Sequence, residues 1–344
     1  MKVVFVHIGE NPTPTLFNAA EIAGKSLPEA EITLISDQPK LLKEFPGTSF
    51  QFNPDLVQPF IRRFVFRNRE LKNIAGGYWM NTILRLFALI QIAQINPDEA
   101  IIHLESDVYL YATKDEFIRY QFAQDFISYP RLSPTRGIAS ILYSPNLTTL
   151  EGFLKNLKRI LIENNRITND MDLLGSALNM ALAKELNSVP GVNGESTERN
   201  LIFDGAALGQ YLLGVDPVHT LGLVVAGYQN SDYPIDLSKT RWSIPKPGKI
   251  VISYMEKTYQ VMSIHAHSKE ILGIPDINNL RWKQIMSEAN LEVPRETHMR
   301  DFEDIYHGIP SLGDRFRIAH KNGFLKHLRK YLAGKTQTLA KKAK

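Results

Sequence analysis

The chain has 344 residues, of which 44% are hydrophobic, and it contains no cysteine. This length and composition suffice for one large domain with a sizeable core. The lack of cysteine excludes disulfide frameworks, thiol nucleophiles and thiolate metal sites, and it fits a reducing compartment. The N-terminal apolar run is too short for a signal peptide, and no run approaches the roughly 18 residues of a membrane span. We therefore expect a soluble, cytoplasmic protein.

The formal net charge of +4 is unevenly distributed. Residues 315–344 carry ten Lys or Arg and no acid, which leaves 30 basic and 36 acidic residues in the rest of the chain. Such a tail is typical of a solvated last helix or of peripheral contact with an anionic membrane surface, here the inner face of the membrane. No base-reading motif accompanies it, so we expect no nucleic-acid partner.

The first third of the chain predicts a βαβ unit. A β-branched run over 2–8 predicts a buried strand, 16–24 a helix that ends at a glycine, and 31–35 a second strand. This succession favours parallel pairing. A polar, irregular zone follows as far as Gly77, and then 81–95 predict a helix that Asn96-Pro97 stops.

The remaining elements continue the α/β pattern. We expect strands over 100–104, 126–129, 138–143 and 261–266, β structure within 220–260, and helices over 148–163 and 169–186. Thr148 and Glu151 resemble a capping box at the start of the first of these two helices.

The stretch HLESDVYLYA, residues 103–112, places Glu105 and Asp107 directly after the predicted strand 100–104. Residues i and i+2 of an extended backbone point to the same side. The carboxyl end of a parallel strand is where open α/β sheets bind ligands. Carboxylate oxygens there suit Mg²⁺ or Mn²⁺ bound to a diphosphate. The alternative is an ordinary polar strand end.

Three further groups of residues carry candidate chemistry. The late stretch VMSIHAHSK offers His265 and His267 as metal ligands and Lys269 as a phosphate contact, or simply a core histidine beside solvated neighbours. Arg85 is the only charged residue of an apolar helix, where it orients the acids or phosphates, forms a salt bridge to Glu105 or Asp107, or extends to the solvent. Asp170 and Asp172 begin a helix and Asp204 lies in a turn, so each is either catalytic or a helix-end acid.

Several common enzyme motifs are missing from the sequence. It has no Walker loop, no G-x-G-x-x-G fingerprint, no G-x-S-x-G elbow and no H-E-x-x-H. These absences argue against P-loop NTPases, classical dehydrogenases, serine hydrolases and zinc proteases.

Taken in order, the motifs KVVFVHIG, LISD, NTILRLFAL, HLESDVYL, RGIASILYSPN, NDMDLL and IHAHSK resemble those of the GT-A nucleotide-sugar glycosyltransferases. The resemblance implies an α/β, Rossmann-type, mixed but mainly parallel sheet flanked by helices. It implies a catalytic domain over 1–275, with a nucleotide-binding half over 1–112 and an acceptor half over 113–275. A helical extension with the basic tail would follow over 276–344.

The same resemblance assigns roles to the candidate residues. Ile8 and Asp37 would contact the nucleotide, Arg85 and Lys269 the phosphates. Asp107, Glu105 and His265 or His267 would hold Mn²⁺ or Mg²⁺. Candidate catalytic acids are Asp170, Asp172 and Asp204.

The implied reaction moves a sugar from a nucleoside-diphosphate sugar, UDP favoured, to a hydroxyl of a glycan, lipid or protein acceptor. NDMDLL is similar to the D-Q-D motif of glycogenin-like retaining transferases, with Met171 in place of Gln, which favours retention. The alternatives are a nucleotidyltransferase and a non-catalytic nucleotide- or sugar-binding protein.

Overall fold

The computed structural model describes residues 1–9, 15–56, 78–120, 122–164, 167, 169–188, 200–205, 208, 240–246, 249–254 and 256–265. The predicted extension 276–344, its basic tail, His267 and Lys269 lie outside these residues. Predictions about membrane contact through the tail therefore stay predictions. None of the described helices combines the length and the hydropathy needed to cross a bilayer.

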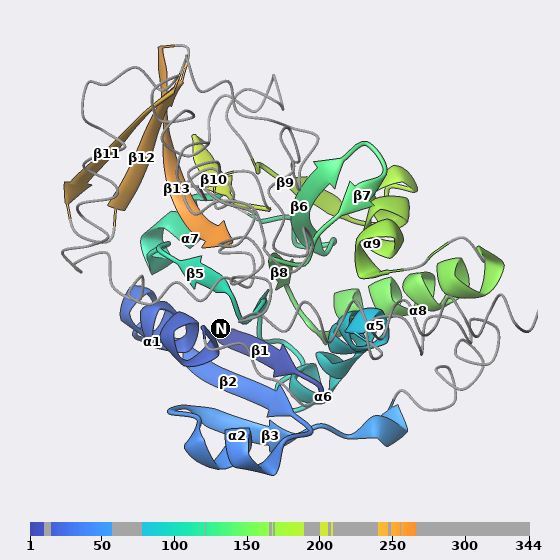
Figure 1. Ribbon diagram of the computed structural model, residues 1–344. Coiled ribbons are helices and arrows are strands. Elements are labelled where there is room, and N and C mark those ends of the chain that lie inside the picture. Colours follow the sequence, from blue (N-terminus) through green and yellow to red (C-terminus); the bar gives the residue numbers. More distant parts are fainter. Residues whose placement is uncertain are drawn as a thin grey trace, which may run out of the picture.

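An eight-stranded sheet forms the centre of the described part, in the order β3-β2-β1-β4-β8-β6-β7, with β9 beside β6 (Figure 1). Its strands are β1 (Lys2–His7), β2 (Glu31–Ser36), β3 (Thr48–Gln51), β4 (Ile101–Leu104), β6 (Ser128–Ser133), β7 (Arg136–Gly137), β8 (Ile141–Ser144) and β9 (Lys184–Leu186).

The pairing in this sheet confirms the predicted α/β class. β1 pairs in parallel with both β2 and β4, and β2 pairs in parallel with β3. β8 then pairs antiparallel with β4 and β6. Because β1, β2 and β4 run in the same direction, their carboxyl ends meet at one edge of the sheet, where open α/β folds bind ligands.

A second sheet has the order β10-β13-β12-β11, with β5 also paired to β13. Its strands are β5 (Val108–Leu110), β10 (Leu201–Phe203), β11 (Thr240–Lys246), β12 (Lys249–Tyr254) and β13 (Lys257–His265). β5 begins four residues after β4 ends, so the chain passes from the first sheet to the second through residues 105–107. Val108 pairs antiparallel with His265, so the end of β13 lies beside the point where the chain leaves the first sheet.

Helices cover both faces of the first sheet (Figure 1). They are α1 (Leu16–Ser26), α2 (Pro39–Glu44), α5 (Tyr78–Ala88), α6 (Ile90–Ala93), α7 (Lys114–Tyr120), α8 (Leu147–Glu163) and α9 (Asp170–Asn179), with a 3-10 turn at Pro54–Leu56. α1 and α7 share one hydrophobic core with the second sheet, whereas α5, α6, α8 and α9 share another. Alternation of side chains along β1 and β4 supplies both cores.

Several predicted element bounds are wrong. The helix predicted over 169–186 ends at Asn179, because the chain turns at Ala181, whose φ is 54°, and then enters β9. The predicted capping box does not begin α8; Asn146 caps it instead, and its side chain accepts a hydrogen bond from the Thr149 amide at 2.9 Å. The helix predicted over 81–95 is divided into α5 and α6, and the zone called irregular contains α2 and β3.

The close packing of α9 against the β6–β7 turn depends on a glycine. A Cβ atom at Gly175 would lie 1.9 Å from the Thr135 carbonyl oxygen, a distance that no side chain tolerates. The Tyr129 hydroxyl also donates a hydrogen bond to the Leu174 carbonyl, which holds the same contact from the sheet side. The middle of α9 is thereby held against β6 and the β6–β7 turn.

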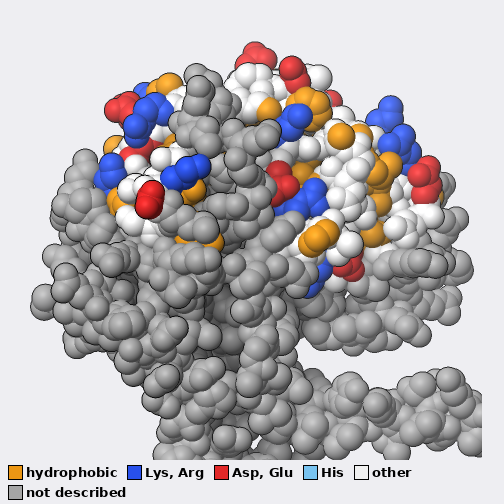
Figure 2. All heavy atoms as spheres, turned by 90° about the horizontal axis from the view of Figure 1, so that it is seen from above, with side chains coloured by type: hydrophobic (Ala, Val, Ile, Leu, Met, Phe, Trp, Pro, Cys, Tyr) orange, Lys and Arg blue, Asp and Glu red, His pale blue; other side chains and the backbone are white. Residues whose placement is uncertain are grey.

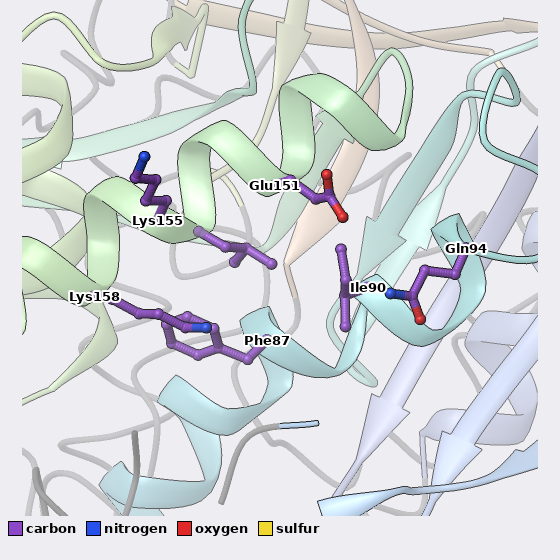
Figure 3. Close-up of a pocket in the computed structure, with 7 residues that line it drawn as sticks. Phe87, Ile90, Gln94, Glu151, Lys155 and Lys158 are labelled. Carbon is purple, nitrogen blue, oxygen red and sulfur yellow. The ribbon is translucent and has the colours of Figure 1, made fainter. Parts of the chain in front are cut away.

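A shallow surface hollow of about 270 Å³ lies between the α5–α6 pair and α8 (Figure 3). The Lys158 ammonium lies 5.6 Å from the centre of the Phe87 ring there. None of the candidate site residues lines this hollow, whose lining residues are Phe87, Ile90, Gln94, Glu151, Leu154, Lys155 and Lys158. On the molecular face in Figure 2, basic and acidic side chains of the described residues are interspersed.

Candidate active site at the carboxyl edge of the sheet

Glu105 and Asp107 lie on a tight turn between the two sheets. The Val108 amide donates to the Glu105 carbonyl at 3.0 Å, so residues 105–108 form a β-turn and not the extended segment that the i, i+2 argument assumed. The Glu105 amide is held by the Ser140 carbonyl and the Ser106 carbonyl by the Thr15 hydroxyl. Both carboxylates are buried, at 7% and 6% exposure, and they converge as predicted although the backbone cause is different.

His265, the last residue of β13, meets both acids. Its Nε2 atom lies 3.4 Å from a Glu105 oxygen and 3.3 Å from an Asp107 oxygen. Its Nδ1 atom lies 2.6 Å from the Gly205 carbonyl oxygen, which can only accept, so Nδ1 carries a proton. Nε2 therefore faces the acids. In the neutral ring this nitrogen carries a lone pair, which a metal ligand requires.

Arg85 lies on α5 and pairs with two acids. Its guanidinium donates to Glu105 at 2.6 Å and to Asp170 at 3.4 Å, and all three side chains are largely buried. The pairing with Glu105 is one of the alternatives that the sequence suggested. Asp170 was not expected as the second partner; it is placed there because Asn169 caps α9 and accepts from the Asp172 amide.

Negative charge is in excess in the cluster, which favours the binding of a cation. Burial opposes protonation of His265, but the Asp107 and Glu105 carboxylates outweigh it and raise the pKa of the imidazole to about 10. Burial raises the pKa of Glu105, against the nearby positive charges of Arg85 and His265. Two buried acids beside one another thus hold an added positive charge, which at neutral pH is a proton on His265.

The donor set fits a divalent cation. One ligand atom each from Glu105, Asp107 and His265 lie within 4.8 Å of one another. Two carboxylate oxygens and one imidazole nitrogen suit Mn²⁺ or Mg²⁺, which keep further positions for phosphate oxygens or water. Whether His267 or Lys269 adds to this set lies outside the described residues.

Asp37 and Ile8 lie at the ends of β2 and β1, beside the cluster along the same edge. The Gly9 amide donates to both Asp37 oxygens, at 3.1 and 3.2 Å. Gly9 has a φ of 120°, and a Cβ there would lie 2.9 Å from the Asn81 side chain, so this turn requires glycine. The predicted roles of Asp37 and Ile8 in nucleotide contact stay predictions.

The other two candidate acids have different surroundings. Asp204 is fully buried, and its carboxylate accepts hydrogen bonds from the backbone amides of His265 at 3.0 Å and Leu208 at 2.9 Å. These contacts fit the turn-capping alternative and fix the end of β13. Asp172 keeps 30% exposure and lies 3.8 Å from the Arg136 guanidinium.

One contact that orients the site was not predicted. The Gly205 carbonyl sets the tautomer of His265, but a backbone oxygen leaves no pattern in a sequence. The small residues of FDGAALG were the available signal, because they allow a backbone to approach another group closely.

The comparisons with known proteins are limited to structures. No family model matches the sequence, and neither does any curated protein. The chain is similar to the glycosyltransferase GlyE of Streptococcus pneumoniae TIGR4, with a TM-score of 0.35 and 16% identity over 57% of this chain and 49% of that one.

Two other solved structures are similar to a comparable degree. The galactosyltransferase LgtC gives a TM-score of 0.37 and 12% identity over 54% of this chain and 73% of that one. A CMP:2-keto-3-deoxy-manno-octonic acid synthetase gives a TM-score of 0.32 and 11% identity over 53% of this chain and 86% of that one. The matched part spans about half of the length of GlyE. The fold class therefore rests on the strand order described above.

Proposed function

We propose that this protein is a metal-dependent glycosyltransferase that moves a sugar from a UDP-sugar to an acceptor hydroxyl of a glycan, lipid or protein. The observation that carries the proposal is the buried cluster of Glu105, Asp107 and His265 at the carboxyl edge of parallel strands. This is the edge at which α/β sheets bind nucleotides, and the cluster selects for positive charge beside a diphosphate.

In the proposed reaction the acceptor oxygen bonds to the anomeric carbon of the sugar while the bond from that carbon to the phosphate oxygen breaks. Glu105, Asp107 and His265 would hold a divalent cation, which would supply Lewis-acid stabilisation of the departing diphosphate. Arg85 fixes the position of Glu105 and adds positive charge beside it. The Gly205 carbonyl accepts from Nδ1 of His265, so Nε2 is the ring nitrogen that faces the acids.

In an inverting reaction a carboxylate must take the proton of the acceptor hydroxyl, and Asp172 is the best placed of the candidate acids for that role. Asp170 is engaged with Arg85, and Asp204 accepts from two backbone amides, whereas Asp172 is partly exposed at the start of α9. Retention of configuration, favoured by the NDMDLL resemblance, is part of the proposal, and in a retaining reaction the groups near Asp170 and Asp172 would instead stabilise the oxocarbenium-like centre. Retention is tested by the anomeric form of the product, read by NMR.

Ligand-induced stabilisation tests the proposal. UDP with Mn²⁺ should raise the melting temperature of the wild type, and UDP with EDTA should raise it much less. Asp107→Asn, which keeps the side-chain shape, should remove the Mn²⁺-dependent part, whereas Asp98→Asn, an acid outside the cluster, should keep it. No response to UDP under either condition would contradict the proposal.

Products distinguish the alternatives. A transferase releases UDP from a UDP-sugar, slowly to water and faster with acceptor. A nucleotidyltransferase would instead release pyrophosphate from UTP and a sugar phosphate. Binding of UDP without release of either product would favour a non-catalytic binding protein.

A further inference from the structure

Ser140 joins the two turns that position the candidate metal ligands. It is fully buried and directly precedes β8. Its carbonyl accepts a hydrogen bond from the Glu105 amide at 3.1 Å, next to the pairing of β4 with β8. Its hydroxyl donates to the Asp204 carbonyl at 2.9 Å. One residue thus holds the acid turn through its backbone and the turn at Asp204 and Gly205 through its side chain.

Asp204 carries this connection on to the end of β13. The Asp204 amide donates to the Ser263 carbonyl at 3.3 Å, and its carboxylate accepts from the His265 amide at 3.0 Å. The whole residue is buried. Because Asp204 is bonded both to Ser140 and to the last residues of β13, the start of β8 and the end of β13 are tied together beside the acid turn.

The backbone of His265 and the direction of its ring depend on different contacts. Pairing with Val108 of β5 fixes the backbone. Rotation of the ring is limited by the hydrogen bond of 2.6 Å between Nδ1 and the Gly205 carbonyl. Gly205 directly follows Asp204, so the position of this carbonyl depends on the turn that the Ser140 hydroxyl holds.

We propose that Ser140 is a positioning residue of the candidate metal site, whose hydroxyl holds the turn at Asp204 and Gly205 so that Nε2 of His265 faces the two carboxylates. The inference rests on the metal binding that the proposed function requires. Loss of a contact that orients a metal-binding imidazole typically lowers metal affinity by about 10- to 100-fold. Mg²⁺ prefers oxygen ligands, so its binding should depend less on the imidazole than that of Mn²⁺.

The experiment measures Mn²⁺ binding to the full-length protein without nucleotide, from the EPR signal of free Mn²⁺, and Mg²⁺ binding by competition. Ser140→Ala should weaken the binding of Mn²⁺ by about tenfold and that of Mg²⁺ by about threefold or less. The unequal loss is the signature of a displaced imidazole, because a general loosening of the site would weaken both ions alike.

The matched control is Ser144→Ala, at the other end of β8. Ser144 is also buried, and its hydroxyl donates to the Asn146 carbonyl at 3.1 Å, away from the acidic cluster. This variant loses the same kind of hydrogen bond and should keep the wild-type affinity for both ions. Ser140→Cys, whose thiol is only a weak donor, should weaken Mn²⁺ binding by an intermediate factor. Melting temperatures show whether each variant folds, and the cysteine variant supplies the comparison if Ser140→Ala does not.

Three results would overturn the inference: unchanged Mn²⁺ affinity in the Ser140 variants, an equal loss in Ser144→Ala, or equal losses for the two ions. A wild type that binds no Mn²⁺ would remove the metal site and the inference with it. The titration needs no donor, so a wild type that binds Mn²⁺ but releases no UDP from UDP-sugars would contradict the proposed function alone, and the variants would still decide the role of Ser140.

Discussion

Arg85 carries the largest predicted effect of a single residue on both stability and turnover. Arg85→Met leaves the buried carboxylates of Glu105 and Asp170 without their cation, and we expect a loss of about 3–5 kcal/mol in the free energy of unfolding. UDP release from the donor should fall as well. Urea unfolding and a UDP-release assay measure the two effects.

A matched control for Arg85 exists on β6. The Arg131 side chain is buried to the same degree and pairs with Glu185 at 2.7 Å, outside the acidic cluster. Arg131→Met should lower stability while turnover per folded molecule stays at the wild-type value. Equal turnover in the two variants would show that Arg85 serves the fold alone.

Residue types at the site were predictable, but several of their partners were not. Two acids after a strand and a histidine at the end of a late strand are local patterns, and both belong to the cluster. The pairing of Arg85 with Asp170 joins residues 85 positions apart and depends on how α5 and α9 pack. Short-range patterns carry no information about such a contact.

At the scale of single helices, two N-caps of the same chemistry allow a controlled comparison. Asn146 caps α8 and Asn169 caps α9, each by accepting from the amide three residues later. Replacing either with alanine should cost about 1 kcal/mol of stability. Only Asn169→Ala should also lower UDP release, because the first turn of α9 carries Asp170.

Chemical denaturation and donor hydrolysis of both cap variants check this expectation. If Asn146→Ala lowered turnover as much as Asn169→Ala, the effect would come from general destabilisation and the first turn of α9 would have no special role.

The existence of the long helices was predictable from apolar periodicity. Their ends depend on single residues, namely the capping side chain at the start and the backbone conformation after the last turn. α8 begins at Leu147 because Asn146 offers a side-chain acceptor, and an in-helix threonine three residues before a glutamate resembles the same signal. α9 ends before Ala181 because that residue adopts a left-handed conformation. Alanine rarely adopts this conformation, so the sequence gives no reason to expect the helix to end there.

For the whole molecule, stability in EDTA should decrease from about pH 7 to pH 9.5. The pKa of His265 in the folded protein is about 10, above the ordinary value of 6.5. Its stabilisation is therefore fully present below pH 6.5 and is lost as the pH rises through 10, at up to about 1.4 kcal/mol per pH unit. Urea unfolding at pH 7, 8 and 9 measures the slope.

The control for this pH dependence is His265→Asn, whose profile should be flatter over the same range. Parallel profiles of wild type and variant would contradict the assignment of the slope to His265. Mn²⁺ needs the deprotonated ring, so the stabilisation that it adds should grow with pH in the wild type.

The layered α/β architecture was predictable from the sequence, but the way in which the chain connects the two sheets was not. A first strand, a helix and a second strand predicted the parallel pairing of β1 and β2. The three-residue strand β5 is too short to stand out in an apolar run, and its partner β13 lies about 150 residues further along the chain. Its pairing with β13 decides where His265 lies.

The junction at residues 105–107 has a consequence for the order in which the molecule acquires its chemistry. Glu105 and Asp107 are synthesised early, but the third candidate ligand atom comes from a residue about 160 positions later, and it reaches them only when β13 has paired with β5. Pairing over such sequence separations is slow, because the entropy of closing the long loop must be paid first. If the proposed site binds a cation, a nascent chain on the ribosome carries two of the three candidate ligands long before it can bind the ion tightly, and cation binding would report that β13 has paired with β5.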